Sequence, residues 1–528
     1  MATELVSTQY FTIAGLILAC LVVHYVWATF FSARARQLAR LPPGPKRIPF
    51  IGNLLDLPNK QSFGEEYWTK HRKLYGPISS MTVFGTTFIV LNDLQIATEL
   101  MDKRSAKYSG RPSFPMASFV AGYEHAWLTQ QHDDVHRAYR KMTHAQFGSF
   151  TAVDRWKQEY DVESRRYLLR LLQKSEGFLD HIRYGSGATS LKILYGYTSD
   201  PSGKDDLIDL AEATMQDFSH LITPGDWLVD TFPLLRYVPD WVPGASFKKK
   251  GREMRERLHA GARKAYEFTT TQMAKKTNKL SLVSEVHKKF GHSMTSTEEL
   301  HLKWTSYSLY MGGADTSVGV IEIFFLVMTS KIDSQRRAQA EIDSVVGTDR
   351  LPDISDQAKL PYVEALYKEI IRWKSLGSIG VPHLADEDDE YENYFIPKGA
   401  VIVPHAAGMY HNPKVYKDPF EWNPDRFLGD NPEPDPQSIT FGFGRRICPG
   451  RYLAMRMMWL EIAQTLAAFD IREIKGEEPS WRFATGAIEH PLPFKADIRT
   501  RSAKHEALVR AVEVEHPLTH GDSHLVPA

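Results

Sequence analysis

The sequence predicts an α-rich mixed α/β fold with a small β part, behind a single N-terminal transmembrane helix. Three observations predict this fold. Residues 10–31 are apolar and carry no charge, and residues 130–375 mostly show apolar side chains at the 3.6-residue spacing of helices. Only short segments, above all residues 78–91, show the apolar–polar alternation of strands. The 528 residues are enough to bury a large core without covalent cross-links.

Composition narrows the class of protein. The 64 Lys and Arg residues balance 64 Asp and Glu residues, so the formal net charge is zero. Because general nucleic-acid binding requires a net basic field, this balance predicts that nucleic acid is not a partner. The chain has two cysteines, Cys20 and Cys448, which excludes a disulfide framework and any zinc site built on several thiolates.

Residues 1–40 are predicted to be a membrane anchor. The segment Tyr10–Phe31 would span about 33 Å as a helix, close to the hydrocarbon thickness of a bilayer, and it has aromatic residues at both ends. Arg34, Arg36 and Arg40 follow it, and the positive-inside rule places everything after them in the cytosol. A cleaved signal peptide and a buried core helix are the alternatives, but the run exceeds a normal signal-peptide core and no clear small-residue cleavage site precedes the arginines.

The rest of the chain is predicted to form one folded domain, residues 41–500, and a polar tail, residues 501–528. The domain begins with Leu41–Pro45 (LPPGP), a stiff, non-helical spacer. We expect the tail to be frayed and its histidines to be solvated. No Gly-rich dinucleotide fingerprint follows a strand, and no phosphate-binding loop is present. If the protein carries out redox chemistry, its electrons must therefore come from another chain.

The most informative segment is Phe441–Gly450 (FGFGRRICPG), which precedes a long apolar helical run at residues 452–470. Its three glycines allow tight turns and the close approach of a large group. Backbone N–H groups at the start of the following helix, with Arg445 and Arg446, predict a lowered pKa for the Cys448 thiol. An inert buried cysteine and a catalytic nucleophile are the alternatives. The flanking glycines and arginines argue against the first, and the lack of a recognisably paired histidine argues against the second.

This segment resembles the haem-binding loop of the cytochrome P-450 monooxygenases, F-x-x-G-x-R-x-C-x-G, at Phe441, Gly444, Arg446, Cys448 and Gly450. The resemblance implies the cytochrome P-450 fold, a large helical domain plus a small β-rich domain. It also implies haem b (iron protoporphyrin IX) as cofactor, with Cys448 as the iron ligand whose electron donation favours O–O cleavage. In the family the phenylalanine shields the sulfur and the arginine pairs with a haem propionate.

Two further segments support the resemblance. Glu369 and Arg372 have the family's E-x-x-R spacing, and Arg426 lies in a Pro-Asp-Arg-Phe segment about fifty residues later, so we expect a buried structural network of the three. Residues 310–317 (YMGGADTS) resemble the family's A-G-x-D-T-T/S oxygen-activation motif, with a glycine in place of the alanine. The resemblance implies that Thr316 hydrogen-bonds dioxygen and that Asp315 feeds protons through water.

Three more residues are implied to bind the haem propionates. His136 and Arg140 lie where the family has a W-R-x-x-R/K helix, with histidine in place of tryptophan. His383 follows Val-Pro where the family places a propionate donor. Nearby, Ser375 and Ser378 replace prolines of the family pattern.

The implied activity is NADPH-driven monooxygenation of a lipophilic small molecule with dioxygen. An NADPH–cytochrome reductase, a flavoprotein, would supply the electrons, and the chain would lie in the endoplasmic reticulum membrane. Tyr391–Lys398 and Phe420–Phe427 are similar to fungal biosynthetic members of the sterigmatocystin-oxidoreductase type. Terpenoid, polyketide and alkaloid substrates all remain open.

Two surfaces are expected to serve these partners. Arg137, Lys141, Arg445 and Arg451 could offer a basic patch to an acidic flavoprotein, or some of them could be solvated or occupied with haem. The aromatic and apolar residues 237–243 fit a second contact with the bilayer, or a loop packed on the core.

Three alternatives to a monooxygenase stay open. The same scaffold could act as an isomerase, a dehydratase or a peroxide-dependent enzyme, although the intact Asp315–Thr316 pair argues against these chemistries. It could also bind haem without turnover, or be a cysteine hydrolase without haem.

Overall fold

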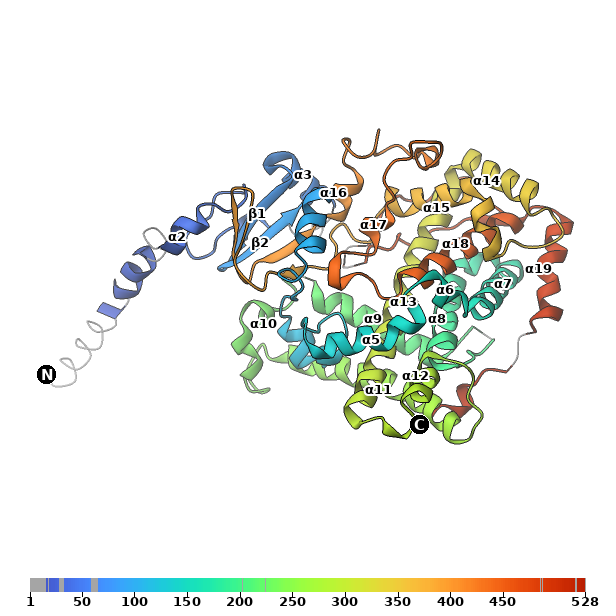
Figure 1. The fold of residues 1–528 in the computed structure, drawn as a ribbon, viewed down its shortest axis with the longest axis horizontal. Coiled ribbons are helices and arrows are strands. Elements are labelled where there is room, and N and C mark those ends of the chain that lie inside the picture. Colours follow the sequence, from blue (N-terminus) through green and yellow to red (C-terminus); the bar gives the residue numbers. More distant parts are fainter. Residues whose placement is uncertain are drawn as a thin grey trace.

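The computed structural model describes residues 16–17, 19–27, 33–57, 65–201, 203–223, 225–484, 486, 488–517 and 520–527 (Figure 1). Its helices are α2 (Ala33–Leu38), α3 (Glu65–Tyr75), α4 (Leu94–Ala97), α5 (Asp134–Phe147), α6 (Phe150–Asp154), α7 (Lys157–Gln173), α8 (Phe178–Tyr195), α9 (Asp206–Ile222), α10 (Leu228–Thr231), α11 (Ser246–Ala274), α12 (Leu282–Phe290), α13 (Ser296–Ser330), α14 (Ile332–Val345), α15 (Pro361–Trp373), α16 (Ala406–Tyr410), α17 (Gln437–Thr440), α18 (Arg451–Ala468) and α19 (Ala503–Glu515). Its strands are β1 (Ile78–Val83), β2 (Thr86–Leu91), β3 (His383–Leu384), β4 (Asp389–Tyr391), β5 (Tyr394–Ile396), β6 (Val401–Pro404), β7 (Phe469–Arg472) and β8 (Asp497–Thr500). The α-rich fold with a small β part is confirmed.

The largest sheet has the strand order β1-β2-β6-β3. β1 and β2 form a hairpin, and its two turn residues, Phe84 and Gly85, have φ values of 47° and 83°. Two left-handed residues are what a tight two-residue hairpin turn requires. β2 then pairs in parallel with β6, and β6 pairs antiparallel with β3. The predicted strand character of residues 78–91 is thus confirmed, and the sheet lies at the end of the molecule from which the N-terminal helix emerges (Figure 1).

The helical part is organised around α13. This helix begins with a capping box, in which the side chains of Thr295 and Glu298 each accept a hydrogen bond from the other residue's backbone N–H. It packs against α5, α8, α9 and α18 and is buried on nearly all sides. Among the helices that the structure describes, α13 alone is long and apolar enough to cross a membrane, yet 72% of its apolar window is buried inside the protein. It is therefore the core helix of the domain.

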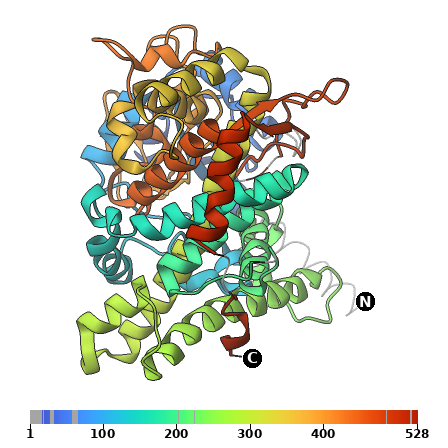
Figure 2. The ribbon, with the colours of Figure 1, turned by 90° about the vertical axis from the view of Figure 1, so that its right-hand side faces the viewer.

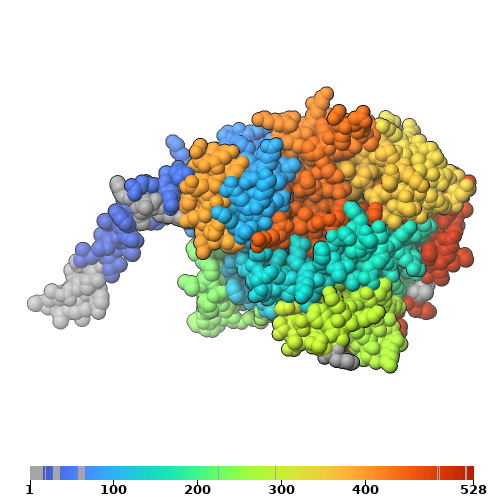
Figure 3. Space-filling model, in the orientation of Figure 1, coloured from blue at the N-terminus to red at the C-terminus, as the bar shows by residue number. Residues whose placement is uncertain are grey.

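The predicted anchor is described only in part. Residues 16–17 and 19–27 are helical and mostly exposed, whereas residues 10–15, 18 and 28–31 lie outside the described residues. Together with α2, the helix projects away from the globular body (Figures 1 and 3). The Phe50 N–H donates to the Tyr25 hydroxyl at 2.7 Å, and the two rings stack at 3.9 Å. The transmembrane span stays a prediction.

The prediction of a frayed tail after Thr500 is wrong. α19 packs against α7 and α18 on the outer face of the helical part, where Val509 and Val512 are fully buried (Figure 2). His505 is also buried, with Nδ1 2.9 Å from the Ser502 hydroxyl, so it is not solvated. The physical reason is the spacing of the two valines, because residues three apart share one face of a helix.

Candidate active site

The cysteine loop has a backbone that few other sequences could adopt. The Cys448 N–H donates to the Phe441 carbonyl at 2.8 Å, which closes the loop. Gly444 has a φ of 56°, and its N–H donates to the Asp102 carboxylate. A Cβ at this position would collide with the carbonyl oxygen of Met101. Gly444 is therefore required by backbone conformation and by packing, as the family motif demands.

The environment of the Cys448 thiol differs from the sequence-based expectation. Burial raises its pKa, and the Gly450 N–H with the charges of Arg140 and Arg451 offsets this only in part. The predicted lowering of the pKa by Arg445 and Arg446 is therefore wrong for the chain by itself. A protonated thiol is a poor nucleophile, whereas a metal ion deprotonates a coordinating thiol outright. The raised pKa thus argues against a catalytic nucleophile and is compatible with a metal ligand.

Close to this loop lies a cluster of buried basic side chains, which we call the cation cluster after its two arginines: Arg111, His136, His383 and Arg446. Burial and the nearby arginines lower the pKa of His136 and His383, so the two histidines are neutral at pH 7. Both Nη atoms of Arg446, Nε of Arg111 and Nδ1 of His136 are buried without a hydrogen-bond partner. Across the described ranges, no ion pair joins Arg446 or Arg111 to a carboxylate within 4.0 Å. Unpaired buried charge is costly, so this arrangement calls for an anionic ligand.

The electrostatics of the cluster show the same need. Burial and the charge of Arg140 lower the pKa of Arg446 to about 10, against a smaller opposing effect of Asp133 and Asp386. Burial, then Arg446 and Arg140, lower the pKa of His136 to about 3. Each protonated group is thus destabilised by its neighbours, and a pair of carboxylates placed among them would relieve this repulsion.

Two predicted propionate ligands are held by the chain itself. Arg140 donates to the carbonyls of Arg445 at 2.9 Å and of Ile447, so it ties α5 to the cysteine loop. His383 Nδ1 lies 2.7 Å from the Tyr108 carbonyl, which can only accept, so Nδ1 carries the proton. Burial and the charge of Arg111 hold the pKa of His383 well below its usual value. To donate from Nε2 as well, His383 would need a second proton.

The residues present fit a haem. Cys448 would ligate the iron, and Arg446, Arg111 and His136 would hold the two propionates. A Cβ at Gly312 or at Gly450 would meet no atom within 4 Å, so both glycines face open space. Sequence reasoning missed Arg111, whose Nη1 donates to the carbonyls of Val381 (3.2 Å) and Pro382 (2.6 Å). The sequence feature that could have drawn attention to Arg111 is its position between a glycine and a proline, where the backbone is constrained.

The oxygen-activation motif lies midway along α13, which continues through both glycines without a break. Thr316 donates to the Gly312 carbonyl at 2.8 Å, and both residues are exposed in the middle of α13, between stretches of mostly buried residues, so they face an opening. Gly313 serves a different purpose. The Ser186 hydroxyl donates to its carbonyl at 3.0 Å, and the Ser190 hydroxyl lies 3.2 Å from where a Cβ would be. One glycine opens the site, and the other lets α8 approach α13 closely.

The predicted structural network is confirmed. Arg372 and Glu369 form a bidentate pair at 2.6 and 2.8 Å, and Arg426 Nε lies 3.2 Å from Glu369. The three side chains are at most 2% exposed. This network fixes α15 against the segment that leads to the cysteine loop.

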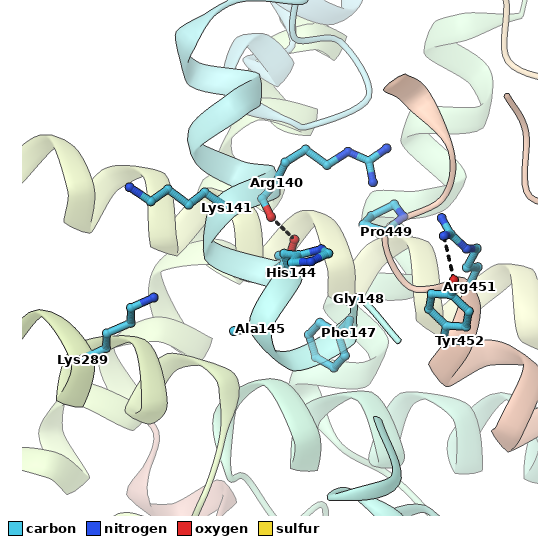
Figure 4. A pocket seen from close by; sticks show the side chains of 11 residues that line it. Arg140, Lys141, His144, Ala145, Phe147, Gly148, Lys289, Pro449, Arg451 and Tyr452 are labelled. Atoms are coloured by element: carbon cyan, nitrogen blue, oxygen red, sulfur yellow. Dashed lines mark hydrogen bonds between the residues drawn. The ribbon is translucent and has the colours of Figure 1, made fainter. Parts of the chain in front are cut away.

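A cavity of about 500 Å³ lies beside the cysteine loop, between α5 and the start of α18 (Figure 4). Basic side chains at its wall come from three elements: Arg140, Lys141, Lys289 and Arg451. Of the basic patch predicted from sequence, Lys141 and Arg451 lie here. Arg137 is ion-paired with Asp134 on its own helix.

Comparison with known proteins agrees with the geometry. The family model for cytochrome P-450 matches residues 42–497. The chain is 40% identical over 497 residues to cytochrome P-450 monooxygenase ppsD of Aspergillus oryzae, covering 92% of this chain and 94% of that protein. It is 36% identical over 488 residues to O-methylsterigmatocystin oxidoreductase of Aspergillus flavus, covering 92% of each. The chain therefore belongs to the cytochrome P-450 family and is a monooxygenase.

Proposed function

We propose that this monooxygenase is anchored in the endoplasmic reticulum membrane and inserts one oxygen atom into a lipophilic fungal secondary metabolite, with electrons from NADPH through a separate reductase. The observation that carries the proposal is the cation cluster beside Cys448, because its unpaired N–H groups fit the propionates of a haem. The relative named O-methylsterigmatocystin oxidoreductase supports a fungal secondary metabolite as substrate. Terpenoid, polyketide and alkaloid skeletons all fit the same chemistry.

The chain's own residues would divide the work as follows. When bound, the haem supplies the centre at which dioxygen is activated. Cys448 holds the iron, and Arg111, Arg446 and His136 fix the orientation of the ring. Thr316, exposed on α13, presents a hydroxyl to the reaction space, and Asp315 supplies protons there. The buried face of α13 keeps bulk water away.

An exposed apolar surface supports membrane contact beyond the anchor. The most exposed apolar side chains in and after α10 are Leu228, Phe232, Leu234, Tyr237 and Trp241, of which Trp241 is 82% exposed. The Phe232 ring lies 5.7 Å from that of Phe84 in the β1–β2 turn. α10 lies at the same end of the molecule as the N-terminal helix in both ribbon views (Figures 1 and 2). Such a surface is typical of proteins that rest on a bilayer.

Turnover conditions test the proposed reaction class. The protein is reconstituted with a fungal NADPH–cytochrome reductase and candidate metabolites, and products are identified by mass spectrometry under ¹⁸O₂. We expect a product that carries one labelled oxygen and depends on NADPH and reductase. Product formed equally well with peroxide alone, or without incorporation of the label, would favour the alternative uses of the scaffold.

The basic cavity makes a separate prediction about the reductase. Lys141 and Arg451 lie next to the cysteine loop without a carboxylate partner within 4.0 Å among the described residues. We expect Lys141→Glu or Arg451→Glu to raise the reductase concentration for half-maximal rate roughly tenfold, since reversed charge slows association with an acidic partner. The steady-state rate is measured against reductase concentration at low ionic strength. Arg137→Glu is the matched control on the same helix, because Arg137 is already paired. An equal effect of the control would refute docking at the cavity.

A further inference from the structure

Asp315 is bound to a histidine that belongs to no recognised motif. His490 Nε2 lies 3.2 Å from Asp315 Oδ1, and His490 Nδ1 lies 2.8 Å from Glu322 Oε2. Asp315 and Glu322 are seven residues apart on α13 and so share one face of the helix. Gly319 lies between them on the helix, where a Cβ would stand in ordinary contact with the imidazole at 3.5 Å but would clash with Leu376 Cδ2. The histidine thus bridges two carboxylates of one helix face, and Gly319 makes room there for Leu376.

The segment that carries His490 is fixed from its other side. The neighbouring Glu489 accepts hydrogen bonds from the Ser378 N–H at 3.0 Å, the Ser378 hydroxyl at 2.5 Å and the Lys374 ammonium at 3.0 Å. A proline at position 378 could donate neither of the first two. The serine in place of the family's proline therefore has a structural reason, since it anchors the residue next to His490.

The surroundings keep the imidazole charged. Burial lowers the pKa of His490, but the hydrogen bonds and charges of Asp315 and Glu322 outweigh burial and raise it to about 9. Farther out, Arg183 on α8 contacts Glu322 at 3.2 Å and Glu212 on α9 at 3.3 Å. Arg183 therefore balances part of the charge of Glu322, which leaves His490 as the cation bonded to Asp315. The His490 side chain is 18% exposed, so solvent protons can reach it.

We propose that His490 is a positioning residue that orients Asp315 and supplies it with the protons that monooxygenation consumes. The proposal rests on the proposed role of Asp315 and Thr316 in proton delivery. Insertion of one oxygen atom reduces the other atom of dioxygen to water, which consumes two electrons from NADPH and two protons. Each proton would pass from His490 Nε2 to Asp315 Oδ1 and onward to the Thr316 side of the site. After the transfer, the neutral imidazole keeps the proton on Nδ1, which donates a hydrogen bond to Glu322. It then regains the Nε2 proton from solvent.

The test uses two substitutions at His490 in the haem-loaded, full-length protein. His490→Gln removes the charge and the transferable proton. His490→Arg keeps a cation between the carboxylates but cannot release a proton at neutral pH. We expect both variants to form roughly tenfold less product per NADPH consumed and to release peroxide instead. In the wild type the amount of product formed per NADPH consumed should fall as pH rises toward 9, whereas in the variants it should stay low at every pH. His505→Gln, a buried histidine on α19, should behave as the wild type.

A second readout does not depend on turnover. In protein with ¹³C-labelled histidine, the NMR signal missing from His490→Gln should titrate near pH 9, and Glu322→Gln should move its pKa toward 6.5. Wild-type coupling in either His490 variant, or a signal that titrates near 6.5 in the wild type, would overturn the proposal. Thr316→Ala distinguishes the role of His490 from the role of the Asp315–Thr316 motif in proton delivery. Wild-type coupling in that variant would refute the proton-delivery role of the motif itself, whatever His490 does.

Discussion

At the scale of single residues, the site is defined by charges that the chain does not neutralise. The sequence predicted His136, Arg140, His383 and Arg446 as propionate ligands because each lies in a segment similar to the family. The structure bonds Arg140 to the cysteine loop, and it places His136 and His383 within electrostatic range of Arg446 in that loop. Arg111 was not predictable in this way, since its importance follows from burial and from the absence of a bonded carboxylate within the described part of the chain.

Removing Arg111 should have opposite effects on the haem-free and haem-loaded protein. In the haem-free chain, Arg111→Met relieves an unpaired buried charge, so we expect the free energy of unfolding to rise by about 1–3 kcal/mol. In the loaded protein it removes a propionate partner, so haem transfer to apomyoglobin should become roughly tenfold faster. Denaturant titration and the transfer rate measure the two effects. Arg337→Met, at an exposed pair with Asp425, is the control. A variant that is less stable without haem and also loses haem faster would contradict the account, as would one that is more stable without haem and also retains haem longer.

At the scale of elements, local spacing predicted what lies on one helix but not what distant segments bring to it. The pair Glu369–Arg372 followed from a spacing of three residues, and the mostly helical course of residues 130–375 followed from periodicity. His490 could not be placed beside Asp315, because the two are far apart in sequence and the contact depends on the Glu489–Ser378 anchor. α19 was missed because only two of its apolar side chains, Val509 and Val512, are buried against the rest of the protein.

The buried network between α15 and the segment around Arg426 should be expensive to break. Glu369→Gln leaves Arg372 and Arg426 without their shared carboxylate, so we expect the protein to lose about 3–5 kcal/mol of stability. Asp425→Asn is the matched control next to Arg426, since Asp425 pairs only at the surface and should change stability by about 0.5 kcal/mol or less. Denaturant unfolding followed by tryptophan fluorescence measures both. Equal losses would mean that the network is not the source of the stability.

At the scale of the whole molecule, the N-terminal helix projects from the end of the body that carries the largest sheet (Figures 1 and 3). The order of helical and strand-like regions along the chain was predictable from hydrophobic periodicity. The positions of α10 and the basic cavity relative to the anchor and the cysteine loop were not, because they depend on packing between elements. The account as a whole depends on a single bond between Cys448 and the iron.

The most direct test of that bond is the absorption spectrum of the reduced, carbon-monoxide-bound protein. We predict the red-shifted Soret band that thiolate ligation produces, and its loss in Cys448→Ser together with activity. An unshifted band in the wild-type protein, or a red-shifted band that survives Cys448→Ser, would contradict the account.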